Sequence, residues 1–276
     1  MSQLKFDMSQ CETCPAHTQL AQMGLKLDNF DRVVALAGNP NTGKSTLFNA
    51  LTGLKQHTGN WPGKTVTRAE GGFEFNGIRY KLVDLPGTYS LLSASQDEEV
   101  ARNFILFGQP DCTIVITDAT ALERNLNLVL QVMEITDKVV VAVNLMDEAR
   151  RKGLDVDARS LARDLGVPAI PITARTGEGI QTLLATMASV IAGETLNRPQ
   201  RVQGTPEFRR AVDEMTPLIE RVAPGVPNAR WIAIRLLDGD ARVQQALLNG
   251  ELAQVATFQR QADAKFSAKI ALDGRQ

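Results

Sequence analysis

Short apolar runs alternate with amphipathic stretches along residues 33–199. The runs are rich in β-branched residues and cover residues 33–37, 80–83, 113–117, 139–143 and 169–172. Such runs are typical of strands buried on both faces, and therefore of a mostly parallel sheet. Between them, apolar residues recur at helical spacing, for example at Leu122, Leu126 and Val129. The alternation predicts an α/β fold with a doubly wound, mostly parallel sheet.

Other segments predict a hairpin and a second, smaller domain. Residues 69–80, with Asn76-Gly77 at their centre, predict a β-hairpin. Residues 197–205 are typical of a linker, and beyond them prolines punctuate short helix-like segments. We therefore expect three parts: an N-terminal extension at residues 1–30, an α/β domain at residues 31–198 and a small all-helical domain at residues 199–276.

Charge and cysteine content limit the classes of function. The 30 basic and 31 acidic residues nearly cancel, so no nucleic-acid partner is expected. Three cysteines are too few for a disulfide framework, which favours a reducing compartment. No secretory signal is evident, and no apolar run reaches the roughly 18 residues that a membrane span requires. We expect the chain itself to be soluble.

The clearest motif follows the first apolar run. Residues 38–45 read Gly-Asn-Pro-Asn-Thr-Gly-Lys-Ser, the pattern of a P-loop between a strand and a helix. Its glycines let backbone N–H groups surround a phosphate, and the helix N-terminus adds positive charge. Lys44 is expected to contact the β- and γ-phosphates, and the Ser45 hydroxyl to bind magnesium. The predicted nucleotide-binding residues here are Gly38, Asn39, Pro40, Asn41, Thr42, Gly43, Lys44, Ser45 and Thr46.

Two later loops are expected to contact the γ-phosphate and magnesium. Asp84 ends the second run and can hold magnesium through water, while the Gly87 N–H can approach the γ-phosphate. Thr65 is the candidate for a second hydroxyl on magnesium. Thr88 stands where many relatives of Ras place a water-orienting glutamine, so hydrolysis is expected to be slow or to use another group. The binding residues predicted in these loops are Gly63, Lys64, Thr65, Asp84, Leu85, Pro86 and Gly87.

The fourth and fifth runs end in motifs that favour guanine over adenine. The Asp147 carboxylate can accept hydrogen bonds from guanine N1–H and the 2-amino group, and adenine offers neither donor. Asn144 is expected to position the loop and touch the base, and the Ala174 N–H to donate to O6. Because these strands end at one edge of a parallel sheet, the motifs converge on one ligand. The predicted residues are Asn144, Leu145, Met146, Asp147, Thr173, Ala174 and Arg175.

Leu145 departs from the common pattern of this motif. Many GTPases carry a lysine at this position, and its stem covers one face of the base. We therefore expect modest nucleotide affinity and fast exchange.

Four segments together resemble the amino-terminal cytoplasmic part of FeoB, the bacterial ferrous iron transporter. They are residues 38–41, the Gly-Asn-Trp-Pro-Gly loop at 59–63, residues 84–91 and residues 231–237. The resemblance covers residues 33–272 and implies a GTPase domain followed by a helical spacer, at residues 206–272, that tunes GDP release. It also implies stimulation by potassium, with Asn41 and the backbone carbonyls near Gly59 and Trp61 holding the ion beside the phosphates.

The resemblance further implies cofactors, partners and a location. The cofactors are GTP or GDP, Mg²⁺ and K⁺, and the expected catalytic residues are Asn41, Lys44, Thr65 and Gly87. The expected partners are a guanine nucleotide, the membrane domain of the same polypeptide and, as a candidate, a second copy of the chain. We expect a piece of a longer transporter at the cytoplasmic face of the bacterial inner membrane, with GTP hydrolysis gating or regulating iron uptake.

The remaining chemistry is open to more than one interpretation. Cys11, Cys14 and His17 are metal-ligand types, but structural zinc sites take four ligands, which favours a reduced extension. Cys112 is expected in the core, and His57 has no assigned role. One alternative function is a soluble RNA-associated GTPase of ribosome assembly or tRNA modification, although no KH loop is recognisable. Another is a nucleotide-binding module with negligible turnover.

Overall fold

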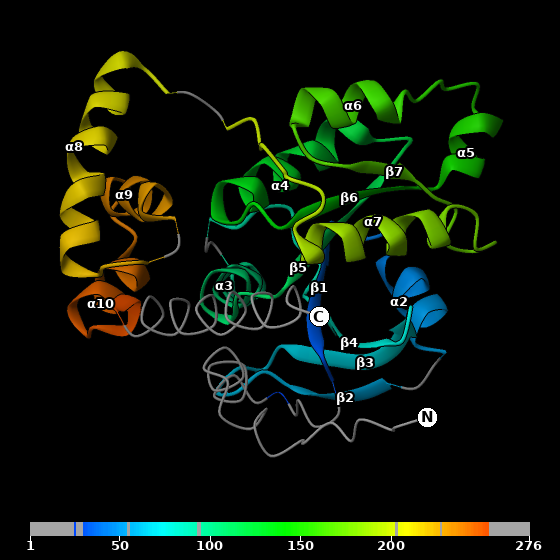
Figure 1. The fold of residues 1–276 in the computed structure, drawn as a ribbon, viewed down its shortest axis with the longest axis horizontal. Helices are drawn as coiled ribbons and strands as arrows, with labels where there is room; N and C mark the ends of the chain where they lie inside the picture. Colours follow the sequence, from blue (N-terminus) through cyan, green and yellow to red (C-terminus); the bar gives the residue numbers. More distant parts are fainter. Residues whose placement is uncertain are drawn as a thin grey trace, which may run out of the picture. The chain divides into compact units, whose positions relative to one another are not determined.

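A seven-stranded sheet organises the larger of two compact units, Asp28–Val202, in the computed structural model (Figure 1). The structure describes Leu25 and residues 30–53, 56–92, 95–201, 204–226 and 228–253. The strand order is β2-β3-β4-β1-β5-β6-β7. The strands β4, β1, β5, β6 and β7 run parallel to one another. Strand β3 is antiparallel to both of its neighbours, β4 and β2. The strands are β1 (Arg32–Gly38), β2 (Gln56–Asn60), β3 (Thr67–Phe75), β4 (Ile78–Asp84), β5 (Cys112–Asp118), β6 (Val139–Asn144) and β7 (Ala169–Pro171). The predicted mostly parallel α/β sheet is confirmed.

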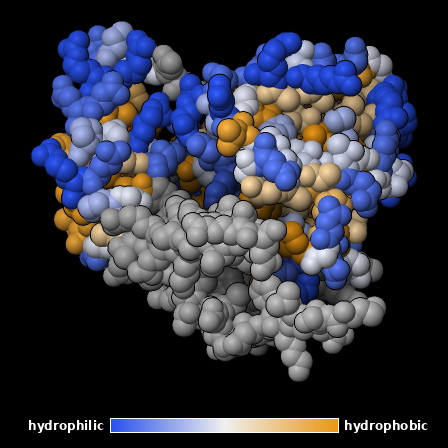
Figure 2. Space-filling model, viewed as in Figure 1, coloured by the Kyte–Doolittle hydropathy of each residue, from blue (hydrophilic) through white to orange (hydrophobic). Residues whose placement is uncertain are grey.

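Helices connect the strands and cover the sheet. They are α2 (Lys44–Thr52), α3 (Gln96–Asn103), the π-helical turn η2 (Phe104–Gly108), α4 (Leu122–Ile135), α5 (Met146–Arg151), α6 (Ala158–Leu165) and α7 (Ile180–Ala192). Helices α2 and α7 share one core cluster with the sheet, while α4 packs against β5 and β6 outside that cluster. Hydrophilic side chains cover the outer surface over α5 and α6 (Figure 2).

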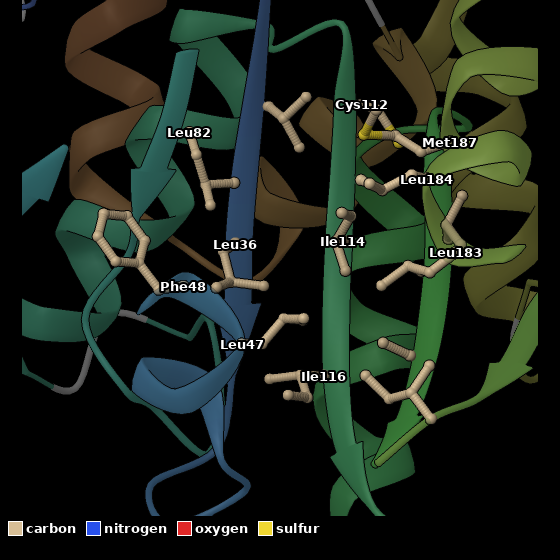
Figure 3. Packing of buried hydrophobic residues seen from close by; sticks show 14 of the residues in the cluster. Leu36, Leu47, Phe48, Leu82, Cys112, Ile114, Ile116, Leu183, Leu184 and Met187 are labelled. Carbon is tan, nitrogen blue, oxygen red and sulfur yellow. The ribbon is translucent and has the colours of Figure 1, made fainter. Parts of the chain in front are cut away.

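Alternate residues of the central strands point into the cluster beneath α2 and α7. Leu36, Leu82 and Ile114 are fully buried there, and Leu47 and Met187 meet them from the two helices (Figure 3). Side chains two apart along a strand lie on one face, which explains why the cluster takes every second residue of each run. The apolar runs therefore form strands that are buried on both faces.

Cys112 belongs to this cluster, as expected from the sequence. Its side chain is fully buried at the start of β5. Burial raises the pKa of the thiol to about 12, so the reactive thiolate does not form near neutral pH. Cys112 is a packing residue.

The predicted hairpin is present, but the strand that flanks it was missed. Asn76 and Gly77 both have positive φ, 51° and 75°, as a two-residue turn between β3 and β4 requires. The segment Gln56–Asn60 pairs with β3 and forms the edge strand β2. Its residues are polar and, where described, exposed, so it carries no apolar alternation. His57 lies on this exposed edge.

The second unit contains three helices that are described over their full length, and residues 251–253 are helical as well. They are α8 (Pro206–Val222), α9 (Ala229–Leu237) and α10 (Ala241–Leu248). Thr205, Asn228 and Asp240 cap them, each accepting a backbone N–H bond at the helix start. Trp231 and Ile232 are buried in this unit. The predicted all-helical segment is confirmed.

Several predictions concern residues outside the described ranges. Cys11, Cys14 and His17, with nearly all of the predicted extension, lie outside them, and so does the chain beyond residue 253. In the ranges that are described, no helix has the length and apolar character needed to cross a membrane.

Truncation of Leu36 tests the buried face of the sheet. Leu36→Ala leaves a cavity at the centre of β1, and we expect the free energy of unfolding to fall by about 2–5 kcal/mol. Leu196→Ala is the matched control, because Leu196 is 78% exposed; we expect a change within about 0.5 kcal/mol. Urea unfolding followed by circular dichroism measures both. Equal effects would contradict the core described here.

Candidate nucleotide-binding site

The loop between β1 and α2 has the backbone shape of an anion cradle. Asn41 and Gly43 adopt left-handed conformations, with φ of 65° and 83°, which turn the chain sharply before α2. No side chain caps the start of α2, so its first N–H groups are open to an anion. The Thr42 hydroxyl donates to the Asn39 carbonyl at 2.9 Å and closes the loop on itself.

Two glycines of this loop lie where no side chain fits. A Cβ on Gly38 would come within 2.4 Å of Ile116 Cγ2, and one on Gly43 within 2.3 Å of Asn144 Nδ2. The side chains of Asn39 and Thr42 are also buried. The Asn39 amide has no hydrogen-bond partner among the described residues, whereas Asn41, Ser45 and Thr46 are exposed.

Lys44 is paired with the carboxylate expected to hold magnesium. Its Nζ donates to Asp84 Oδ1 at 2.5 Å and to the Leu85 carbonyl at 2.7 Å. Burial raises the pKa of the Asp84 carboxyl above its ordinary value, although the Lys44 ammonium acts in the opposite direction. The structure thus brings Lys44 and Asp84 together, and a phosphate or a metal ion would have to replace this pair.

The loop after β4 is attached to the P-loop strand. The Leu85 N–H donates to the Leu36 carbonyl at 3.0 Å, and the Thr88 N–H donates to the Gly38 carbonyl at 3.3 Å. Gly87 lies beside Pro40, since a Cβ added to it would be 3.5 Å from Pro40. These contacts place Gly87 next to the phosphate cradle, as its predicted role requires.

Thr88 does not take the place of a water-orienting glutamine. Its side chain is buried, and its hydroxyl donates to the Ser90 carbonyl at 2.7 Å and accepts the Ser90 N–H at 3.3 Å. The hydroxyl is thus used within its own turn, so any orientation of attacking water must come from another group.

The loop that carries Thr65 is held against α3. The Thr65 hydroxyl lies 3.4 Å from Gln96 Oε1, and Lys64 Nζ pairs with Glu99 Oε2 at 2.8 Å. Thr65 is exposed, and in the described residues it makes no hydrogen bond to Ser45 or Asp84. Its predicted place on magnesium remains a prediction.

Trp61 anchors this loop. It is 5% exposed, its ring packs edge-on against Phe104 of η2 at 5.4 Å, and the Arg68 guanidinium lies over it at 5.3 Å. The Trp61 carbonyl accepts the Lys64 N–H at 3.0 Å, and Gly59 pairs with Arg68 between β2 and β3. No described contact joins these predicted potassium ligands to Asn41.

A single buried amide joins the phosphate end of the site to the base end. Asn144 Nδ2 donates to the Thr42 carbonyl at 2.8 Å, and Asn144 Oδ1 accepts the Ala174 N–H at 2.9 Å. The Asn144 side chain is 1% exposed. The expected positioning role of Asn144 agrees with these bonds. Ala174 gives its N–H to Asn144 in this structure, and its donation to guanine O6 stays a prediction.

Asp147 lies in the first turn of α5 and is paired with Arg175. Arg175 Nη2 is 3.1 Å from Asp147 Oδ2, and this hydrogen bond lowers the pKa of the Asp147 carboxyl. Leu145 precedes the helix in a left-handed conformation, φ 63°, and with Met146 it is partly buried. Thr173 donates its hydroxyl to Glu178 Oε2 at 3.2 Å.

Two protein-family models match the chain over most of its length. The model of Ferrous iron transport protein B matches residues 32–187, and that of the FeoB cytosolic helical domain matches residues 205–272. The chain belongs to the FeoB family. It contains the family's G domain, a GTP-binding P-loop GTPase domain, followed by the cytosolic helical domain.

Curated FeoB relatives are much longer than this chain. The Fe(2+) transporter FeoB of Salmonella typhimurium is 38% identical over 225 residues, which cover 80% of this chain and 28% of that protein. Its counterpart in Escherichia coli K12 is 39% identical over 211 residues, or 75% of this chain and 27% of that protein. The matched part is therefore less than a third of these relatives.

Solved FeoB structures share the fold. The cytosolic domain of T. maritima FeoB in a GDP form has a TM-score of 0.71 at 33% identity, covering 83% of this chain and 93% of that chain. Its GMPPNP form has a TM-score of 0.72 at 33% identity, covering 83% and 95%. The FeoB G domain of Methanococcus jannaschii has a TM-score of 0.52 at 45% identity, covering 58% and 97%.

Some residues of this FeoB site were missed by sequence reasoning. Gln96 and Glu99, which hold Thr65 and Lys64, belong to a helix start that the sequence does signal. Ser95 is followed by Glu98, and the Ser95 hydroxyl accepts the Glu98 N–H at 3.2 Å. This spacing is half of a capping box. That the helix would meet the Thr65 loop depends on tertiary packing and has no local signal.

Removal of the Asn144 amide should weaken both folding and nucleotide binding. Asn144→Ala leaves the Thr42 carbonyl and the Ala174 N–H buried without partners, and we expect a loss of about 2–4 kcal/mol in the free energy of unfolding. GDP affinity should also fall, because the two loops are no longer tied. Urea unfolding and calorimetric titration with GDP measure the two effects.

Asn125→Ala is the matched control for this change. Asn125 is 4% exposed and also makes two backbone hydrogen bonds, to the Asp118 N–H and the Ala121 carbonyl, but both lie in one loop. It should lose stability and keep its GDP affinity. Equal GDP affinity in the two variants would show that the Asn144 bridge does not shape the site.

Proposed function

We propose that this chain binds guanine nucleotides and hydrolyses GTP to GDP and phosphate as the cytoplasmic part of a ferrous iron transporter. The observation that carries the proposal is the Asn144 bridge between the P-loop and the loop of Ala174. The bridge joins the loop after β1, which would hold the phosphates, to the ends of β6 and β7, where the guanine-reading residues follow. All three strands end at the same edge of the sheet, where α/β folds bind ligands. The GDP and GMPPNP forms of T. maritima FeoB support the same nucleotide class.

Lys44 has two alternative partners in this proposal. Its ammonium group donates hydrogen bonds to Asp84 and to the Leu85 carbonyl in this structure. When a nucleotide binds, it would donate to the β- and γ-phosphates instead. Asp84 then becomes available as a metal ligand. Because its pKa is raised by burial, protons compete with a metal ion at Asp84 to a higher pH than at an ordinary aspartate.

The donors near the P-loop fit Mg²⁺. Ser45 is exposed in the first turn of α2, Asp84 reaches the neighbouring Lys44, and both offer the hard oxygen ligands that Mg²⁺ prefers. Thr65 would supply a further hydroxyl once its contact with Gln96 is released. When bound, Mg²⁺ neutralises charge on the β- and γ-phosphates.

Oxygen atoms on the other side of the loop would hold K⁺. Asn41 is exposed at the turn of the P-loop, and the carbonyls of Gly59 and Trp61 would complete an all-oxygen set. A cation held there would supply positive charge that stabilises the transition state. The Thr88 hydroxyl is bonded within its own turn, so the attacking water would have to be oriented by another group. We place Asn41, Lys44, Thr65 and Gly87 in the catalytic machinery.

Regulation would follow from the two loops that respond to the γ-phosphate. The loop of Thr65 is held to α3 by two side-chain contacts, which contact with the nucleotide would replace. We propose that this rearrangement passes to the helical unit and to a membrane part beyond this sequence, and so regulates iron uptake. The protein would then act at the cytoplasmic face of the bacterial inner membrane. The family match favours this function over an RNA-associated GTPase.

The choice of monovalent cation tests the catalytic part of the proposal. GTP hydrolysis in K⁺ should exceed that in Na⁺ by at least about tenfold, and Asn41→Ala should abolish the difference, because the cation loses its side-chain ligand. Asn76→Ala is the control, since Asn76 is also exposed with positive φ, 51°, but lies in the β3–β4 turn. Phosphate release gives the rates. Equal wild-type rates in the two salts would remove Asn41 and potassium from the mechanism.

Base selectivity tests the binding part. GDP should bind more tightly than ADP by a factor on the order of 10⁴, because adenine leaves the Asp147 carboxylate without its donors. Asp147→Asn should weaken GDP binding by about 10- to 100-fold through loss of charge-assisted hydrogen bonds. Asp155→Asn changes an exposed aspartate nearby and should leave GDP affinity unchanged. Calorimetry measures each. ADP held as firmly as GDP would overturn the assignment.

A further inference from the structure

Arginine and guanine offer a carboxylate the same kind of hydrogen-bond donors. The guanine edge presents N1–H and the 2-amino group side by side in one plane. A guanidinium group presents adjacent N–H donors in a planar fork. An aspartate that reads guanine through these donors is therefore also a good partner for an arginine side chain.

Arg175 makes such a hydrogen bond to Asp147. Its Nη2 donates to Asp147 Oδ2 at 3.1 Å, while its side chain is otherwise 75% exposed. The hydrogen bond from Arg175 is the main cause of the lowered pKa of Asp147, which keeps the carboxylate ionised. The oxygen that Arg175 contacts belongs to the group proposed to bind the base.

Two neighbouring arginines have other ion-pair partners, although the charge of Arg151 also helps to lower the pKa of Asp147. Arg150 is bound by both oxygens of Glu178, each at 2.7 Å, and Arg151 lies 3.3 Å from Glu148. Among the described residues, Arg175 is thus the one cation in ion-pair contact with Asp147.

The backbone keeps Arg175 within reach. The preceding residue, Ala174, is buried and fixed by its N–H bond to Asn144. A donor tethered in this way returns to its acceptor at high effective concentration, whereas the base must arrive from solution.

We propose that Arg175 is an intramolecular competitor of guanine for the Asp147 carboxylate. The ion pair occupies the Asp147 carboxylate when the site holds no base, breaks when guanine binds, and forms again as the base leaves. The inference rests on the proposed function, since it assumes that Asp147 reads guanine. Leu145 in place of lysine was the first reason to expect modest affinity and fast exchange, and this competition is a second.

Removal of the competitor should tighten GDP binding. Arg175→Gln keeps a side chain of similar length without the charge, and we expect its dissociation constant for GDP to fall roughly two- to fivefold, the range for an exposed ion pair. The gain should be present at about 0.05 M sodium chloride and shrink towards none at about 0.5 M, because salt screens the pair in the wild type. Calorimetric titration with GDP measures both.

Arg163→Gln is the matched control. Arg163 is 74% exposed and pairs with Asp164 in α6, so its loss removes a comparable surface charge away from Asp147. Its GDP affinity should equal that of the wild type at each salt concentration. A gain as large as that of Arg175→Gln would show a general charge effect and overturn the inference.

An Asp147→Ala background separates competition from direct contact with the nucleotide. Without the carboxylate, the further change Arg175→Gln should leave the weakened GDP affinity unaltered. The same gain in both backgrounds, or weaker GDP binding by Arg175→Gln alone, would overturn the inference. If wild-type protein binds GDP no better than ADP, the proposed function fails as well; if it prefers GDP but Arg175→Gln does not tighten binding, only the inference fails.

Discussion

The two hydrogen bonds of the Asn144 side chain hold the site together. One amide, 1% exposed, satisfies a P-loop carbonyl and an N–H of the loop after β7. The same side chain occupies the space in which residue 43 would carry a Cβ, which helps to explain why that residue is glycine. Because both bonds are buried, the distance between the two ends of the site is set by the protein rather than by a ligand.

The charged groups of the site are paired with one another at both ends. Lys44 lies against Asp84 at the phosphate end, and Arg175 lies against Asp147 at the base end. The Lys44–Asp84 pair is largely buried, and leaving either charge there without a partner would be costly. The Arg175–Asp147 pair is exposed on its arginine side and contributes less. When a nucleotide binds, these charged groups would exchange their present partners for groups of the nucleotide. Only the difference in free energy between the two sets of contacts then contributes to nucleotide affinity.

The sheet and the P-loop could be predicted from the sequence because their signals are local. Apolar runs mark strands such as β5, and the glycines of residues 38–45 mark the turn into α2. Strand β2 could not be predicted in this way, since a polar edge strand has no buried face. The position of Thr65 could not be predicted either, because it depends on the packing of Trp61 against Phe104, which is 43 residues away along the chain. Thr88 was rightly singled out as unusual, but its burial is a tertiary effect.

Trp61 and Trp231 are the two tryptophans of the chain, and each compact unit contains one of them. Both indoles are 5% exposed, and Trp61 lies between an arginine and a phenylalanine in the loop expected to respond to nucleotide. Each unit therefore has its own built-in fluorophore. With one of the two replaced by phenylalanine, the emission of the other reports on the surroundings of a single unit without an added dye.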